Sequence, residues 1–266
     1  MSFIDSPFVD VHVCWQPRFP RSCRSTGQRL PALLFLTLLL LGLAGCGGDG
    51  SHGYADRPPT NRTALVAWQE WTRFGRSTVV YGGAANGYTN RAGMNEHSEP
   101  LNSRVGDYWG SCGHPEWNGR TSGRPWSGAF VSWVMTRSGV SPSAFAPAGR
   151  HGQYLMSLYD REHSGRGAGF ALHAPNEYAP KEGDLVCTGT AGPTWRYADS
   201  HTARRRIDNT VSHCDVVTDV RGGFVQAVGG NVKNSVTMSL YPVDPRGRLA
   251  GTPGKLWMMV VENRAT

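Results

Sequence analysis

Several features that define common protein classes are scarce in this sequence. Charged residues make up only 18% of the 266 positions, whereas glycine (34) and proline (17) are abundant. This composition argues against a helical bundle or a coiled coil and favours one loop-rich domain with short strands. The histidines show no metal-ligand spacing, so neither a metal nor another cofactor is expected.

Clustered positive charge is also missing. The basic residues that give the net charge of +7 are scattered, apart from the arginine triplet at residues 204–206. No aromatic residues alternate with that triplet, which we interpret as a solvated loop. The sequence therefore predicts no nucleic-acid partner.

One long apolar run is present near the start, over residues 30–41, after four arginines: Arg18, Arg21, Arg24 and Arg29. It is long enough for the apolar region of a signal peptide but short for a membrane-spanning helix. The following residues, Leu43-Ala44-Gly45-Cys46, resemble the lipobox of a bacterial lipoprotein. This resemblance implies lipidation at Cys46. An uncleaved apolar anchor is the alternative.

These features divide the chain into three parts. We expect a signal peptide over residues 1–46, a flexible Gly-, Asp-, Ser- and Pro-rich tether over 47–60, and a folded domain over 61–266. With Gly47 after the lipidated cysteine, the resemblance implies an outer-membrane lipoprotein that faces the periplasm. The membrane contact would be the lipid on Cys46, and we expect a monomer.

Three cysteines remain after the lipobox: Cys112, Cys187 and Cys214. The oxidising periplasm would permit one disulfide. Cys187 and Cys214 both lie in strand-like runs, so a bond between neighbouring strands is possible. Two buried free thiols are the alternative.

Apolar spacing predicts helices in the first half of the domain. Asn61 can cap the first helix, and the most apolar helix begins near Ser127 and ends at Gly139. Two more helices are expected, from about residue 102 and over about 149–162. Residues 81–102 are rich in Gly and Asn, so we expect an ordered surface loop there.

In the second half the pattern changes to short Val-rich runs separated by Gly, Asn or Pro, as in an antiparallel meander. These runs cover residues 183–188, 211–220, 223–229, 235–241 and 256–262. Helices followed by a sheet indicate an α+β domain.

Several sequence motifs indicate a particular type of α+β domain. Residues 126–134 (WSGAFVSWV) resemble the nucleophile helix of CHAP domains, cysteine- and histidine-dependent amidohydrolases and peptidases, with Ser127 in place of the cysteine. Residues 183–186 (GDLV) and 229–231 (GGN) resemble the strands around their catalytic histidine. Together with residues 104–109 (RVGDYW), 151–154 (HGQY) and 212–215 (SHCD), the sequence is more closely similar to the bacterial family named domain of unknown function 2272, over about residues 61–241.

The resemblance implies a papain-like fold of the CHAP or NlpC type, with N-terminal helices packed on a C-terminal antiparallel sheet of five or six strands. In such a domain the nucleophile begins the central helix, and the first long strand carries the base. Ser127 would then be the nucleophile, His213 the base and Asn231 the residue that orients the ring. Asp215 ranks second as the orienting residue because alternation puts it on the same face as His213.

Two further residues, Trp126 and His151, are candidates for the cleft but have no catalytic step. His151 would line the same cleft or cap a loop, and Trp126 is a packing residue more often than a substrate platform. The three main candidates also have structural alternatives. Ser127 could be an N-cap, His213 a strand histidine with satisfied hydrogen bonds, and Asn231 a turn residue.

The resemblance implies an envelope hydrolase of amide or peptide bonds, with a peptidoglycan-type substrate. Because a serine hydroxyl stays protonated until attack, Ser127 would need a true general base where a cysteine would not. An inactive envelope module that binds a cell-wall glycan, peptide or protein therefore remains the alternative. Lipid acyl or thioester hydrolysis is a third possibility.

Overall fold

The computed structural model describes residues 57–82, 87–89, 94–121, 123–191, 196–197 and 203–266. The expected signal peptide, the expected lipidation site Cys46 and most of the expected tether lie outside the described residues. The described end of the tether is fixed to the domain, because Pro59 is buried and Thr60 donates hydrogen bonds to Glu182. No helix in the described ranges is long and apolar enough to cross a bilayer.

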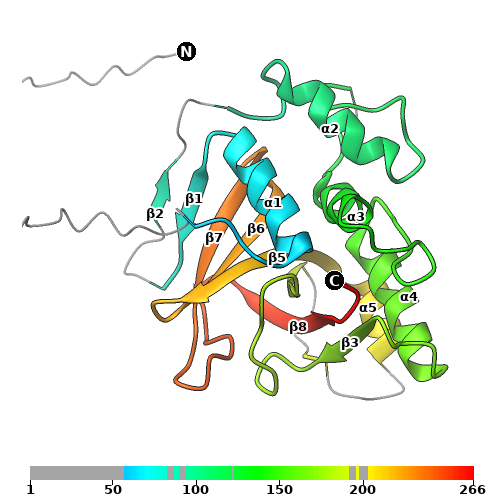
Figure 1. Ribbon diagram of the computed structural model, residues 1–266, viewed down its shortest axis with the longest axis vertical. Coiled ribbons are helices and arrows are strands. Elements are labelled where there is room, and N and C mark those ends of the chain that lie inside the picture. Colours follow the sequence, from blue (N-terminus) through cyan, green and yellow to red (C-terminus); the bar gives the residue numbers. More distant parts are fainter. Residues whose placement is uncertain (1–56, 83–86, 90–93, 122, 192–195, 198–202) are drawn as a thin grey trace, which may run out of the picture. The chain divides into compact units, whose positions relative to one another are not determined.

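The fold is α+β, with five helices in the described residues (Figure 1). They are α1 (Arg62–Arg73), α2 (Leu101–Gly110), α3 (Ser127–Arg137), α4 (His151–His163) and α5 (Ala203–Asn209). Asn61 caps α1 by accepting hydrogen bonds from the backbone N–H groups of Thr63 and Ala64, as its side chain predicted. The short helix α5 carries the arginine triplet, so these residues are solvated as predicted but not in a loop.

Eight strands form one sheet in the described part of the chain. Their order is β2 (Gly87–Thr89), β1 (Ser77–Val80), β7 (Ser235–Pro242), β6 (Phe224–Val232), β5 (Val211–Arg221), β4 (Leu185–Ala191), β8 (Leu256–Asn263) and β3 (Phe170–His173). β1 and β7 pair in parallel, and the other neighbours are antiparallel.

The sequence therefore predicted too few strands, five or six instead of eight, and it did not predict the parallel pair of β1 and β7. All five predicted runs form strands, β4 to β8, in the middle of the sheet. The missed strands β1, β2 and β3 add to the edges and are only three or four residues long. Such short segments are too brief to show an alternating pattern, and β2 lies within the expected surface loop.

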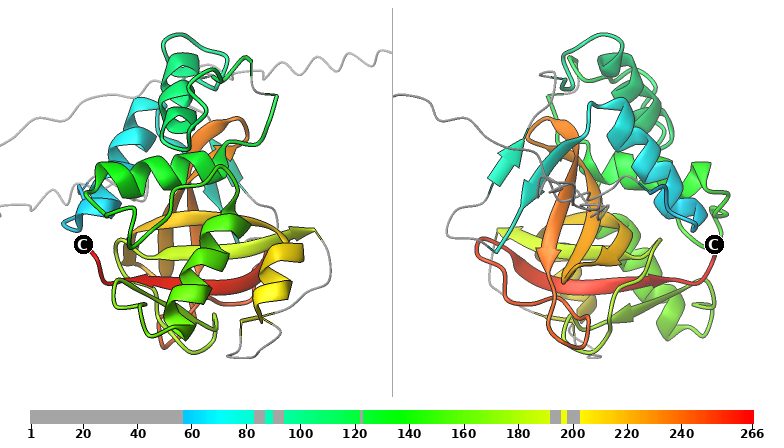
Figure 2. Two further views of the ribbon diagram at one scale, coloured as in Figure 1. Left: turned by 90° about the vertical axis from the view of Figure 1, so that its right-hand side faces the viewer. Right: turned by 60° about the vertical axis from the view of Figure 1, so that its left-hand side comes forward.

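Helix α3 is the most deeply buried helix, since every residue from Ser127 to Met135 is buried. It lies between α2 and α4 (Figures 1 and 2) and packs on β5 and β6. The main core joins α3 and its neighbouring helices to one face of the sheet, whereas a second, smaller core covers side chains such as Val186, Val217 and Tyr241. The start of α3 is thus fixed from several sides.

Two cross-links hold the elements around α3. Glu70 of α1 accepts hydrogen bonds from Arg104 and from the Tyr108 hydroxyl of α2, which joins these two helices through a buried carboxylate. Cys187 of β4 forms a disulfide with Cys214 of β5, where the two residues pair directly in the sheet. The sequence had left this pairing open.

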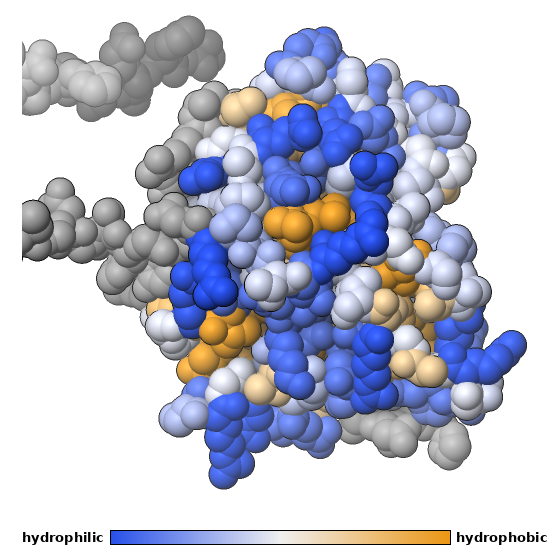
Figure 3. All heavy atoms as spheres, in the orientation of Figure 1, coloured by the Kyte–Doolittle hydropathy of each residue, from blue (hydrophilic) through white to orange (hydrophobic). Residues whose placement is uncertain are grey.

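The face of the molecule seen in Figure 3 is mostly hydrophilic, with small separate apolar areas. Large exposed apolar side chains among the described residues are Val80 of β1, Val211 and Val220 at opposite ends of β5, and Leu256 of β8. Isolated apolar residues of this kind are ordinary on a protein surface.

Candidate active site

Ser127 is the first residue of α3, and its side chain is held by a histidine. Its hydroxyl oxygen lies 2.7 Å from Nε2 of His151, which is the first residue of α4. The N-cap position of α3 is occupied by Trp126, whose side chain makes no capping hydrogen bond. Ser127 therefore has a different place from the N-cap that composition alone suggested.

The starts of α3 and α4 approach closely because small residues face one another. A Cβ atom on Gly128 would lie 2.5 Å from the carbonyl oxygen of Gly149. One turn further along α3, the Ser132 hydroxyl donates to the carbonyl of Ala148 and accepts from its N–H, at 2.8 and 2.9 Å. These contacts hold His151 in front of Ser127.

His213 of β5 is held by a carboxylate. Its Nε2 donates to Oδ1 of Asp215 at 2.7 Å, and the Tyr241 hydroxyl donates to Oδ2 of the same carboxylate at 2.6 Å. Asp215 is 1% exposed. Burial raises the pKa of this carboxyl, but the attraction of His213, its hydrogen bond, Lys255 and the Tyr241 hydroxyl outweigh that effect, so the pKa lies below its ordinary value.

Two successive glycines of β6 allow His213 with Asp215 on one side, and the start of α3 on the other, to approach this strand closely. A Cβ on Gly229 would lie 1.8 Å from Oδ1 of Asp215 and 3.0 Å from Nε2 of His213. A Cβ on Gly230 would lie 2.5 Å from Cβ of Phe130, in the first turn of α3. Both close approaches need glycine, which gives the Gly229-Gly230 motif a steric reason.

Ser127 and His213 lie on the same side of the molecule, because both are neighbours of His151. The ring centroids of His151 and His213 are 5.4 Å apart. In the described residues no hydrogen bond joins Ser127 directly to His213. The site consequently contains two histidines, one in contact with the hydroxyl and one in contact with the carboxylate.

The two histidines differ in burial. His151 is 4% exposed, and burial together with the neighbouring His213 holds its pKa well below the ordinary value, with Asp215 opposing only in part. His151 is therefore neutral at neutral pH. Its Nδ1 lies 2.5 Å from the hydroxyl of Tyr154, one turn further along α4, and burial raises the pKa of that phenol, which stays protonated.

Asn231 does not reach the candidate base. It adopts a positive φ of 58° at the bulge in β6, and within the described residues its side chain makes no hydrogen bond. The polar partner of His213 is Asp215, which sequence analysis had ranked second. Asn231 occupies the turn position that was its structural alternative.

Trp126 is a packing residue. It is 1% exposed, its ring lies against Phe74 and Tyr108, and its indole N–H donates to the carboxylate of Glu96. It cannot present a face to a substrate, but it ties the preceding loop to the start of α3.

Tyr154, Tyr241 and Glu96 were missed by sequence analysis. Tyr154 follows His151 by three residues on a helix, a spacing that brings side chains together, and it could have been considered on that ground. Tyr241 and Glu96 gave no local signal, because their partners Asp215 and Trp126 lie 26 and 30 positions away.

Cys112, the free cysteine in the described part of the chain, is a poor candidate for the nucleophile. Its thiol is half-buried beside Ser111, and burial raises its pKa. A raised pKa leaves less thiolate, which is the reactive form. The described residues contain no group of three or more His, Cys, Asp or Glu side chains placed to hold a metal ion.

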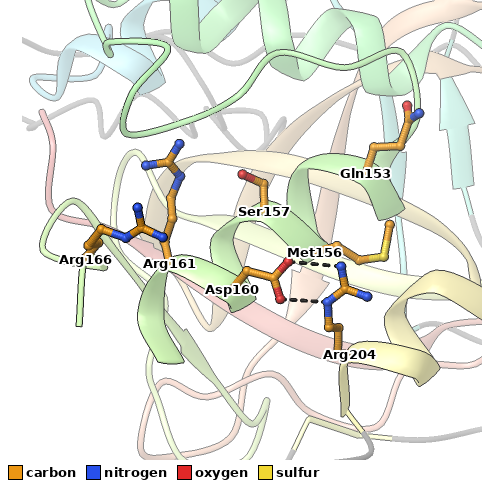
Figure 4. Close-up of a pocket in the computed structure, with 7 residues that line it drawn as sticks. All are labelled: Gln153, Met156, Ser157, Asp160, Arg161, Arg166 and Arg204. Atoms are coloured by element: carbon orange, nitrogen blue, oxygen red, sulfur yellow. Dashed lines mark hydrogen bonds and ion pairs between the residues drawn. The ribbon is translucent and has the colours of Figure 1, made fainter. Parts of the chain in front are cut away.

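Three cavities in the described residues have linings that do not include Ser127, and two of them are larger than the third. One, of about 370 Å³, borders the outer side of α4, where Asp160 accepts two hydrogen bonds from Arg204 (Figure 4). The other, of about 710 Å³, runs between α2 and the second half of α3 and is lined by Arg104, Trp133 and Arg137, among others. The ring of the nearby Trp117 stacks on His114 and has the guanidinium of Arg124 over it.

Comparison with known families supports the similarity to domain of unknown function 2272. Residues 93–263 match the profile of the family described as "Uncharacterized protein conserved in bacteria (DUF2272)". No curated protein and no solved structure matches the chain. The match covers more than half of the sequence, and the protein belongs to this family.

Proposed function

We propose that this protein is a cell-envelope hydrolase of amide or peptide bonds that uses Ser127 as its nucleophile. The observation that supports this most strongly is the contact of the Ser127 hydroxyl with one histidine, beside a second histidine paired to a buried carboxylate. A nucleophile, a base and a group that orients the base are the elements of serine-type acyl transfer.

His213 is the proposed base, with Asp215 in the orienting role first expected for Asn231. An ionised carboxylate can only accept hydrogen bonds, so Asp215 keeps the proton of His213 on Nε2. The lone pair then lies on Nδ1, which is ready to accept a proton. The phenol of Tyr241 holds the other carboxylate oxygen and keeps Asp215 from turning away.

The reaction follows from these roles. The oxygen of Ser127 attacks the carbonyl carbon while its proton passes to Nδ1 of His213, and the carbonyl electrons move onto oxygen. Collapse of this intermediate breaks the C–N bond, and His213 gives its proton to the leaving amine. Water, deprotonated by His213, then attacks the acyl-serine ester, and the departing Ser127 oxygen takes the proton back.

The start of α3 can stabilise the oxyanion. The backbone N–H groups in the first turn of a helix have no intrahelical partner, and the helix dipole favours negative charge there. Ser127 is the first residue of α3, and Trp126 supplies no capping side chain. A carbonyl oxygen next to Ser127 would face these donors.

The envelope location and the peptidoglycan-type substrate rest on sequence alone. The lipobox-like residues 43–46 support a lipid anchor, and the similarity to CHAP and NlpC-type enzymes supports cell-wall peptides as substrates. The alternative, a non-catalytic binding module, is favoured by one observation: Ser127 and His151 are only 7% and 4% exposed.

The test is turnover of cell-wall peptides and intact peptidoglycan by the purified protein, with labelling by a fluorophosphonate that reacts with activated serines. Ser127→Ala should abolish both, and His213→Ala should lower kcat by about 10² to 10⁴-fold. Ser157→Ala, which alters a serine on the outer side of α4, is the matched control and should change neither.

Unchanged turnover in Ser127→Ala would eliminate the mechanism. Wild-type protein that neither turns over these substrates nor reacts with the probe, but binds peptidoglycan, would favour the binding module.

A further inference from the structure

The hydrogen bonds of Tyr154 determine which nitrogen of His151 carries the proton. The Tyr154 hydroxyl is fully buried and protonated, and its hydrogen-bond partner in the described residues is Nδ1 of His151. A buried hydroxyl without an acceptor is unfavourable, so the phenol donates to Nδ1. The single proton of the neutral ring is then on Nε2.

That proton points at the candidate nucleophile. Nε2 of His151 lies 2.7 Å from the Ser127 oxygen, so His151 donates and Ser127 accepts. In this state His151 has no lone pair available for the Ser127 proton. The proton of Ser127 is free to go to another acceptor, and His213 is the neighbouring ring whose partner, Asp215, leaves a lone pair exposed.

We propose that His151 is a second catalytic histidine, which acts as a neutral hydrogen-bond donor to the Ser127 oxygen and not as the base. This inference rests on the proposed function. The donor stabilises the Ser127 oxygen whenever it carries negative charge, both as it loses its proton and as it leaves the acyl ester. No covalent bond to His151 forms or breaks.

A neutral donor suits this position better than a charged one. When His213 takes the proton from Ser127 it becomes a cation, with its ring centroid 5.4 Å from that of His151. A second positive charge there would oppose protonation of His213 and weaken it as a base. Burial keeps His151 uncharged, so it can donate a hydrogen bond without this penalty.

A glutamine at position 151 distinguishes a hydrogen-bond donor from a base, because its amide N–H can donate a hydrogen bond but its amide cannot accept a proton from serine. His151→Gln should keep kcat within about tenfold of wild type, whereas His151→Ala should lose about 10² to 10³-fold, as expected for loss of one transition-state donor. In the matched pair, His213→Gln should be as inactive as His213→Ala. Equal, severe losses in His151→Gln and His151→Ala, in protein with native thermal unfolding, would identify His151 as the base.

A second measurement does not depend on activity. ¹⁵N NMR of the histidine rings should show the His151 proton on Nε2 in the wild type, and Tyr154→Phe should shift it towards Nδ1. A proton on Nδ1 in the wild type would overturn the proposal even if every variant folds poorly. Unchanged turnover in Ser127→Ala would instead refute the proposed function. The NMR result would then report only which nitrogen of His151 carries the proton.

Discussion

His151 and His213 are the same residue type with rings 5.4 Å apart, yet the protein gives them opposite surroundings. His213 is half-buried on a strand and has a carboxylate partner, whereas His151 is buried at the start of a helix between a serine and a phenol. A carboxylate favours the protonated form of an imidazole, and burial beside neutral partners disfavours it. The role of each ring is therefore determined by its hydrogen-bond partners and its burial, since the residue type is the same.

Replacing the carboxylate of Asp215 should have the largest effect on activity, because it changes the partner of His213 and not that of His151. In Asp215→Asn the amide can donate to Nε2 of His213, which moves the ring proton to Nδ1 and removes the lone pair that the base needs. We expect kcat to fall about 10³ to 10⁴-fold with little change in fold.

Asn231→Gly is the matched control for this substitution. It removes the side chain first expected to orient His213 and preserves the positive φ. Activity there should stay within about twofold of wild type. A larger loss in Asn231→Gly than in Asp215→Asn would restore Asn231 as the orienting residue.

Breaking the disulfide should weaken the strand that carries His213 without altering the chemistry of either ring. Replacement of Cys187 and Cys214 by serine opens a link between residues 27 positions apart. The free energy of unfolding should fall by about 3 kcal/mol, as measured by urea denaturation. Because both side chains are fully buried, the Cys187→Ala/Cys214→Ala pair serves as a control against the added cost of burying hydroxyls.

A larger side chain on β6 should disturb the Asp215 carboxylate and leave His151 unchanged. In Gly229→Ala the new methyl group would overlap Oδ1 of Asp215, so the carboxylate must turn away from His213. We expect kcat to fall about 10 to 100-fold, with the contact of Ser127 and His151 preserved. Gly110→Ala, where a Cβ meets nothing within 4 Å, should leave activity unchanged.

The smallest expected effect is a change in how stability depends on pH. Because the pKa of His151 is lowered in the folded protein, the unfolded chain binds this proton first as the pH falls below about 6.5. The contribution of His151 to the free energy of unfolding is therefore fully present above that pH. It decreases as the pH falls, by up to about 1.4 kcal/mol per pH unit for one group.

His151→Gln should flatten this part of the curve of unfolding free energy between pH 7 and pH 5. The groups that face His151, namely Tyr154, His213 and Asp215, remain in both proteins. Ser157→Ala, which changes no titratable group, should reproduce the wild-type slope. A steep slope that survives in His151→Gln would show that another group causes it.

The sequence by itself determined the α+β class, the helix that begins at Ser127 and the five middle strands, because these depend on local apolar spacing and on glycine and asparagine at fixed places. It also brought Ser127, His151, His213 and Asp215 into consideration. Only the tertiary structure decided which of them touch: Asp215 and not Asn231 beside His213, and His151 in front of Ser127. Hydrogen bonds act over about 3 Å, and their partners here come from separate elements whose approach is governed by packing at Gly128, Gly229 and Gly230. The short strands β1, β2 and β3 depended on the same kind of distant contact, since each is too short to be specified by its own residues.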